Sequence, residues 1–561
     1  MSRYTISKVL FFVVLGIIPA AITYSSDRQK AVNAFFDAHN VRSYNKCGFH
    51  IIANYFGTPE DKFGVKGILQ IRPTNDASII SGSGKFRIHF DTTDINGNQP
   101  FLYDSTGQEI PGSTMAFADS VSKICDYVYH IEVDSLGYPP PPSDNGAGGG
   151  NEYDIYIQSL PLGEYGYTDW DPSDTLLKRI NPTFAAWTVI RNEFQSTYTK
   201  GIPAMEVTIA HEFHHGIQIG NYGLWQNDDL WFYELTSTWM EQVVYPEVKD
   251  YYQYLDYFFS NVDLPFNFYD DYNFAGYERC VFGIFVQNEY GASAMKSIWE
   301  EMSHERPIPA IEDAFKSGGK DPASMFQLFA QWNYFTNYRT PLASQFNIIS
   351  YPDAGSYPLV KVSGKINIST SAGGVDFSGS AMRLTEYFYQ VLNGADTLGF
   401  VIVNNNFDAA AKSDTTNFSF SAGISSGGSN CVKKLVNGDC FFFEVSDNSN
   451  WGFIPFVAVS SVFAEQNNLV FPQPFDPSLQ QVKIPYPFSG TSSASLLIFG
   501  TSGRLLRKID SASGAMYYLG EKYFTWDGRD ESGKFVSSGI YIYVLTDGTK
   551  SIVGKIAVVR N

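Results

Sequence analysis

The chain of 561 residues contains little cysteine, little histidine and few charged residues. Charged side chains make up 17% of it, against roughly 25% in an average soluble domain. Its five cysteines include no C-x-x-C pair of the kind that binds metal. The net charge of −19 argues against nucleic acid or an anionic membrane as a partner, since both attract basic surfaces. Hydrophobic residues still reach 44%, which is enough for packed cores.

Long hydrophobic runs are also missing, apart from one short run near the start. Arg3 and Lys8 precede the apolar run Val9–Ile22, and the chain turns polar at Ser25. Fourteen residues cannot comfortably cross a hydrocarbon core of about 30 Å. The pattern predicts a cleaved signal peptide within residues 1–25, no transmembrane anchor, and a protein that is secreted or held at the cell surface.

The length exceeds what one hydrophobic core can organise, so several domains are expected. Aromatic residues reach 16%, which suits β-rich modules. Residues 26–75 form an N-terminal segment that is either a pro-segment or the first layer of the following domain. We predict domains at 76–345, 346–463 and 464–561.

The first of these domains changes its pattern half-way. Strand-like runs at 84–90, 153–158 and 183–190 are rich in β-branched and aromatic residues. Helical patterns follow, at 204–219, 231–244, 248–260, 276–290, 292–303 and 322–338. Beyond residue 345 short alternating strands replace the helical period. The predicted fold class is multidomain, an α+β domain followed by two all-β domains.

The sequence HEFHH at 211–215 is an H-E-x-x-H motif. On a helix, positions i and i+4 lie on one face, so His211 and His215 can direct both imidazoles at one Zn²⁺ ion. Glu212 is rotated away from that axis, where a general base can take a proton from a water on the metal. His214 lies one position off the metal face, and we expect it to pack rather than to bind metal.

The third ligand is predicted to be Glu234, which follows His215 with 18 residues between them. Asp228, Asp229 and Glu241 are alternatives, although both aspartates precede the second helix. A third histidine in the pattern H-x-x-G-x-x-H is excluded, because the required glycine and histidine positions hold other residues, Gln218 and Asn221.

The stretches HEFHHGIQ and WFYELTSTWME together resemble secreted bacterial gluzincin metallopeptidases, which are distantly like thermolysin. The resemblance covers about residues 75–340. It implies a zincin-like catalytic domain and a zinc-dependent endopeptidase acting on proteins or peptides. Thr238 stands where thermolysin has an aspartate, so a hydroxyl would replace the carboxylate that orients a ligand.

Two further assignments complete the expected site. Tyr277 is our candidate for the group that stabilises the developing oxyanion. The strand at 183–190 is expected to be the edge strand that binds extended substrate, because it precedes the zinc helix as that strand does in zincins.

The C-terminal segment 464–561 resembles immunoglobulin-like modules of exported bacterial enzymes, including type IX sorting domains. The resemblance is carried by the stretches FPQPFDP, LLIFGTSGRLL, WDGRD and SGIYIYVL. It implies contact with secretion machinery or surface attachment, with a plain β-sandwich spacer as the alternative. Residues 346–463 are expected to form a β-sandwich accessory domain. Within it, Cys431 and Cys440 are either disulfide-bonded or buried free thiols.

The sequence therefore favours a secreted zinc endopeptidase. The alternative is a surface adhesin or binding protein whose zinc site is structural or vestigial. The intact Glu212 favours the enzyme, because a structural zinc site needs no base.

Overall fold

The computed structural model describes most of the chain from Lys46 onward. The described ranges are 46–56, 72–94, 97–177, 181–225, 227–270, 275–367, 375–393, 396–407, 415–425, 433–434, 440–445, 451–458, 470, 474–478, 481–485, 494–501, 503–511, 515–518, 521–547 and 551–560. The predicted signal peptide lies outside them. Within these ranges no helix is long and apolar enough to cross a membrane.

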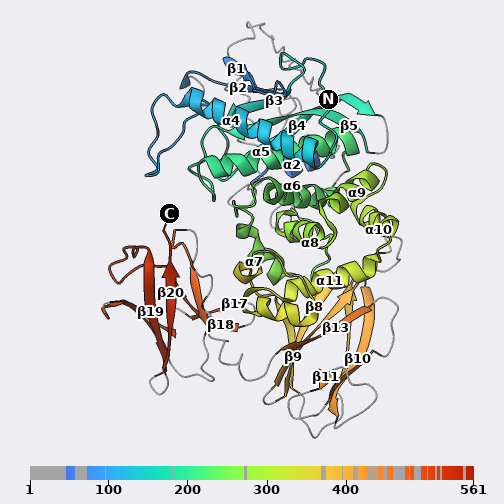
Figure 1. Cartoon of the computed structure of the whole chain (residues 1–561), viewed down its shortest axis with the longest axis vertical. Coiled ribbons are helices and arrows are strands. Elements are labelled where there is room, and N and C mark those ends of the chain that lie inside the picture. Colours follow the sequence, from blue (N-terminus) through green and yellow to red (C-terminus); the bar gives the residue numbers. More distant parts are fainter. Residues whose placement is uncertain are drawn as a thin grey trace, which may run out of the picture.

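A five-stranded sheet opens the described structure (Figure 1). Its strands are β1 (Ala77–Ile80), β2 (Phe86–Phe90), β3 (Tyr153–Gln158), β4 (Gly166–Leu177) and β5 (Thr183–Arg191), in the order β1-β2-β3-β5-β4. The three inner strands are parallel, and both edge strands run antiparallel to their neighbours. The three strands expected from sequence are therefore present.

One expectation about this sheet is wrong. The strand at 183–190 is β5, which lies between β3 and β4 and is buried along its whole length. Uninterrupted apolar and β-branched residues indicate a strand covered on both faces, not an edge. The edge strand beside β5 is β4.

Two long helices cover one face of this sheet (Figure 1). They are α4 (Thr114–Tyr129) and α5 (Ile202–Ile217). The buried side chains of α4 recur with a helical period. A short helix, α2 (Phe49–Phe56), lies near α6 and β4. It places part of the N-terminal segment inside the hydrophobic core, where Cys47, Phe49 and Ile52 are fully buried.

The second half of this region is helical. It comprises α6 (Leu230–Val244), α7 (Tyr252–Ser260), α8 (Cys280–Tyr290), α9 (Ala292–Met302), α10 (Pro307–Ser317) and α11 (Pro322–Tyr334). The helices predicted from sequence are confirmed to within a few residues at most of their ends, whereas α2, α4 and α10 were not predicted. One hydrophobic core runs from Cys47 through these helices to Phe407.

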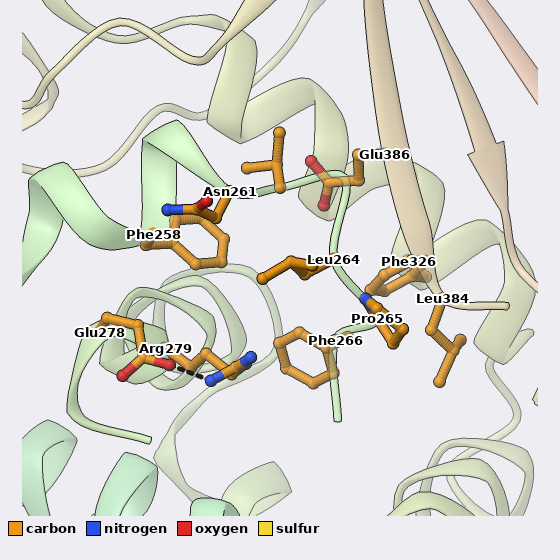
Figure 2. Close-up of a pocket in the computed structure, with 11 residues that line it drawn as sticks. Phe258, Asn261, Leu264, Pro265, Phe266, Glu278, Arg279, Phe326, Leu384 and Glu386 are labelled. Atoms are coloured by element: carbon orange, nitrogen blue, oxygen red, sulfur yellow. Dashed lines mark hydrogen bonds and ion pairs between the residues drawn. The ribbon is translucent and has the colours of Figure 1, made fainter. Parts of the chain in front are cut away.

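Beyond the helices lie two four-stranded sheets, β13-β9-β8-β6 and β11-β12-β10-β7. Their strands are β6 (Val362–Asn367), β7 (Val375–Met382), β8 (Thr385–Asn393), β9 (Asp396–Asn404), β10 (Thr415–Ser425), β11 (Lys433–Lys434), β12 (Cys440–Val445) and β13 (Trp451–Ala458). Helix α11 contacts β9 and β13. A small pocket at this junction is lined by side chains of helical and strand segments, with Glu386 facing the Glu278–Arg279 ion pair across it (Figure 2). None of the predicted metal ligands lines this pocket.

The C-terminal region has its own core and two more sheets, β14-β18-β17 and β16-β15-β19-β20. Its strands are β14 (Val482–Pro485), β15 (Ser495–Gly500), β16 (Leu505–Asp510), β17 (Ala515–Tyr518), β18 (Glu521–Trp526), β19 (Gly539–Thr546) and β20 (Ser551–Val558). A multidomain protein of mixed helices and sheets is thus confirmed.

The cysteines fall into two groups. Cys47, Cys125 and Cys280 are buried and free. Cys440 is disulfide-bonded, and Cys431, its predicted partner, lies outside the described residues. The interpretation of Cys440 as a buried free thiol is therefore wrong.

Candidate metal centre

The three predicted ligands converge from two helices. His211 and His215 lie one turn apart on α5, and Glu234 faces them from α6. The Nε2 atoms of the two histidines are 3.1 Å apart, and Glu234 Oε2 lies 3.0 Å from His211 Nε2 and 3.4 Å from His215 Nε2. Zinc–nitrogen bonds of about 2.0–2.1 Å in a tetrahedral site separate neighbouring ligand atoms by about 3.3 Å. These spacings fit one tetrahedral metal ion.

A fourth side chain completes the cluster. Cys47 Sγ and the three predicted ligand atoms all lie within 4.8 Å of one another, and all four residues are buried. A backbone bridge pairs Cys47 with Gly166 at the start of β4, which fixes the sulfur beside α5. This Cys/His/His/Glu cluster has the donor types and the spacing to hold a metal ion.

Side chains behind the ligands hold the two imidazoles in place. His211 Nδ1 lies 2.8 Å from Glu241 Oε1, and His215 Nδ1 lies 2.7 Å from Gln218 Oε1. Such partners fix the ring orientation and leave Nε2 free for metal. Thr238, which the sequence suggested for this role, has a buried hydroxyl without a hydrogen-bond partner among the described residues. Glu241 on the next turn of α6 is the orienting carboxylate instead.

Glu212 lies beside the cluster, as a general base requires. Its Oε2 accepts a hydrogen bond of 2.9 Å from Thr168 Oγ1 of β4. Burial raises the pKa of Glu212 above its ordinary value, and the nearby histidines oppose that shift. A carboxyl group with a raised pKa is a better proton acceptor in the deprotonated state.

Tyr277 also reaches the cluster. It lies in the turn Tyr277–Arg279 just before α8, and its hydroxyl donates to Cys47 O at 3.0 Å. The same hydroxyl is 3.2 Å from His50 Nδ1. Burial raises the pKa of Tyr277 well above its usual value, so the phenol keeps its proton and can donate a hydrogen bond.

The carboxylates around His211 govern its charge when no metal is bound. Burial alone would lower the pKa of His211, but hydrogen bonds to Glu234 and Glu241 raise it to about 9. Burial would raise the pKa of Glu234, but the neighbouring histidines hold it well below its ordinary range. A cation in this pocket is therefore compensated by two carboxylates, which suits a divalent metal.

The other residues considered from sequence lie outside the cluster. His214 is buried with Nδ1 at 2.9 Å from Glu132 Oε2, and burial holds its pKa well below the ordinary value. Asp229 accepts a hydrogen bond from Arg306 Nε at 2.6 Å. Asp228 lies in the short turn before α6. Sequence reasoning missed Cys47, and no local motif around it marks it as a ligand.

Comparisons with known proteins bear on this helical region. Residues 199–333 match a family model described as a family of unknown function, DUF6055. The matched span contains the three predicted ligands, Glu212 and Tyr277, and it excludes Cys47. A comparison with curated proteins gives no match.

Two solved structures from Porphyromonas gingivalis share weak similarity. One is PorZ, described as an essential bacterial surface component of the type-IX secretion system; it is 24% identical over 21% of this chain, with a TM-score of 0.14. The other is dimeric latent PorU, 15% identical over 36% of this chain, also with a TM-score of 0.14. The matches cover 15% of the PorZ chain and 19% of the PorU chain. Scores this low do not establish a shared fold.

Proposed function

We propose that this protein is a secreted zinc endopeptidase with a zincin-like catalytic domain. The proposal is supported by one observation: the buried carboxylate of Glu212 lies beside a cluster of four side chains whose donor atoms are spaced to hold one metal ion. A structural site would need the ligands but not the adjacent base.

Each residue then has a distinct part in peptide hydrolysis. His211, His215 and Glu234 would hold Zn²⁺, which supplies Lewis acidity and activates a water molecule. Glu212 would act as the general base that accepts a proton from this water and as the acid that delivers it to the leaving amine. Thr168 orients Glu212 through its hydrogen bond. Tyr277, buried and protonated, donates to Cys47 O in the full chain, and once that contact is released it would donate to the oxygen on which negative charge develops.

The substrate would lie along the sheet edge. Strand β4 is an outer strand of the five-stranded sheet, and its Thr168 touches the base. An extended peptide pairing with this strand would bring its scissile bond to the cluster by main-chain hydrogen bonds. Protein or peptide substrates fit this geometry.

The flanking regions fit an exported enzyme. We assign residues 464–561 an immunoglobulin-like sorting role that delivers the protein to secretion machinery or to the cell surface, and residues 346–463 an accessory β-sandwich. These assignments rest on the N-terminal signal pattern and on the sequence resemblance of the C-terminal segment.

The test is release of fluorescent fragments from labelled casein, measured together with metal content. Because Cys47 stands in the site, the assay uses both the full chain and its Cys47→Ala variant. We expect activity that a chelator abolishes and that zinc restores.

One observation favours the alternative function: four protein donors form a closed set, which is typical of structural zinc. Zinc-loaded protein that leaves casein and peptide libraries intact in both forms would favour an adhesin with a structural zinc site.

A further inference from the structure

Residues 46–56, called here the plug segment, precede the five-stranded sheet in the sequence and contact the candidate centre. Lys46 O accepts from Tyr165 N at 2.8 Å, and Gly48 N donates to Gly166 O at 3.0 Å. The plug segment therefore pairs in parallel with the first residues of β4. The N–H of Tyr165 and the carbonyl of Gly166 are backbone groups that an extended substrate would need for pairing with this strand.

The sulfur of Cys47 lies where catalysis requires a water molecule. It is within 4.8 Å of the ligand atoms of His211, His215 and Glu234, and it lies close enough to Glu212 for the two groups to interact electrostatically. A water that is activated by the metal and loses its proton to Glu212 must stand between those same groups. Phe49 N–H donates to Cys47 Sγ at 3.3 Å, which stabilises a sulfur carrying negative charge.

Three further contacts hold the plug segment in place. Lys46 Nζ is buried between Glu241 Oε2 at 2.7 Å and Asp250 Oδ2 at 2.8 Å. The ring of Phe49 stacks on His215 with centroids 4.0 Å apart. His50 Nδ1 lies 3.0 Å from Glu234 Oε1. The segment thus contacts two of the predicted ligands, His215 and Glu234, and the carboxylate of Glu241 that orients His211.

We propose that Cys47 is the fourth protein ligand of the metal and that the plug segment holds the full chain in a latent form. The thiolate fills the position of the catalytic water while the adjacent backbone covers the start of β4. Water and substrate are excluded together. Displacing the segment opens the fourth position to water, and the released sulfur takes up a proton. Latency rests on the proposed peptidase function, whereas ligation by Cys47 does not.

Cobalt substitution tests ligation without any assay of activity. The full chain loaded with Co²⁺ should show the near-ultraviolet charge-transfer absorption of a cobalt–thiolate bond. The band should vanish in Cys47→Ala and in the near-isosteric Cys47→Ser, and it should persist in Cys125→Ala, which removes a buried free cysteine of α4. Thermal melting of each variant confirms folding. Absence of the band from the parent would overturn the proposal.

Azide then reports whether the fourth position is open. It should leave the visible spectrum of the cobalt-loaded parent unchanged and shift that of Cys47→Ala. If fewer than one parent molecule in ten is open, zinc-loaded Cys47→Ala should hydrolyse casein at least about tenfold faster than the parent. A parent that takes up azide as readily as the variant would overturn latency. An open, azide-binding variant with no hydrolysis would instead count against the peptidase function and leave ligation by Cys47 standing.

Discussion

Glu212 and Glu206 lie on the same helix, α5, but only Glu212 touches the candidate centre. In a Cys47→Ala background, Glu212→Gln keeps the shape and the three ligands, so zinc content and melting temperature should hold. Turnover should fall by about 10²–10⁴-fold, the usual value of general-base assistance. Glu206→Gln is the matched control and should leave zinc content, melting temperature and turnover unchanged. Casein turnover in Glu212→Gln close to that of its background would show that the proposed base is wrong.

Glu241 contributes to the same centre without being a ligand. Replacing it by Gln weakens the acceptor for His211 Nδ1 and removes one of the two carboxylates that hold Lys46. Loss of such an orienting partner typically costs about 10–100-fold in metal affinity. We expect a loss of that size for Glu241→Gln in a competition titration with a fluorescent zinc chelator. Glu247→Gln, at an exposed site beyond the same helix, should bind zinc like the parent. An unchanged affinity for Glu241→Gln would mean that the hydrogen bond does not position His211.

The sequence predicted those parts of the site that lie on one helix or at a known spacing. His211, Glu212 and His215 follow from helical periodicity, and Glu234 follows from its separation along the chain. Cys47 and Glu241 could not be assigned in this way. Cys47 reaches the cluster through a strand bridge to Gly166. Glu241 was considered only as a metal ligand, whereas in the structure it orients His211. Contacts made by tertiary packing leave no local pattern.

At the level of elements, strand β4 shows where sequence reasoning failed. Its sequence GYTDWDPSDTLL contains proline, serine and aspartate in the middle, a composition that indicates a turn. In the structure the register with β5 shifts between Trp170 and Thr175, so the turn-forming residues are accommodated as an irregularity within the strand. Helix α4 is different, because its buried residues recur with a clear helical period that could have been recognised.

The contact between α11 and β8 makes a prediction about pH. Both Glu386 oxygens accept from Asn333 Nδ2 at 3.1 Å, and burial raises the pKa of Glu386 from 4.5 to about 8. Between those values the folded protein keeps a proton that the unfolded chain releases, so the free energy of unfolding should fall as pH rises. Glu386→Gln removes this dependence. The melting temperature of Glu386→Gln minus that of the parent should therefore increase between about pH 5 and about pH 8.

The control for this prediction is Glu109→Gln, because Glu109 is exposed and lies far along the chain from this contact. Its melting temperature relative to the parent should not depend on pH over the same window. A difference between Glu386→Gln and the parent that stays constant with pH would mean that Glu386 is ionised in the folded protein.

At the scale of the whole molecule, the described residues pack around two separate cores. The larger core joins the plug segment, the five-stranded sheet, the helices and the nearest strands of the accessory region. The smaller core lies within the C-terminal region and shares no residue with the larger one. Metal binding and the fold around it therefore depend on the first core, which leaves the C-terminal region free for another task.

Deleting residues 464–561 should separate these tasks. An ion pair of 3.8 Å joins Lys483 of the C-terminal region to Asp256 of α7, and an ion pair that keeps access to solvent contributes little stability. We expect the truncated chain to keep its zinc content and the melting transition of the larger core, but to be misdirected during export. Fractionating cells that express both forms measures delivery to the medium and the surface. A full-length Lys483→Met variant, which loses this ion pair, should be delivered like the parent. Equal delivery of the truncated and full-length chains would remove the sorting role of the C-terminal region.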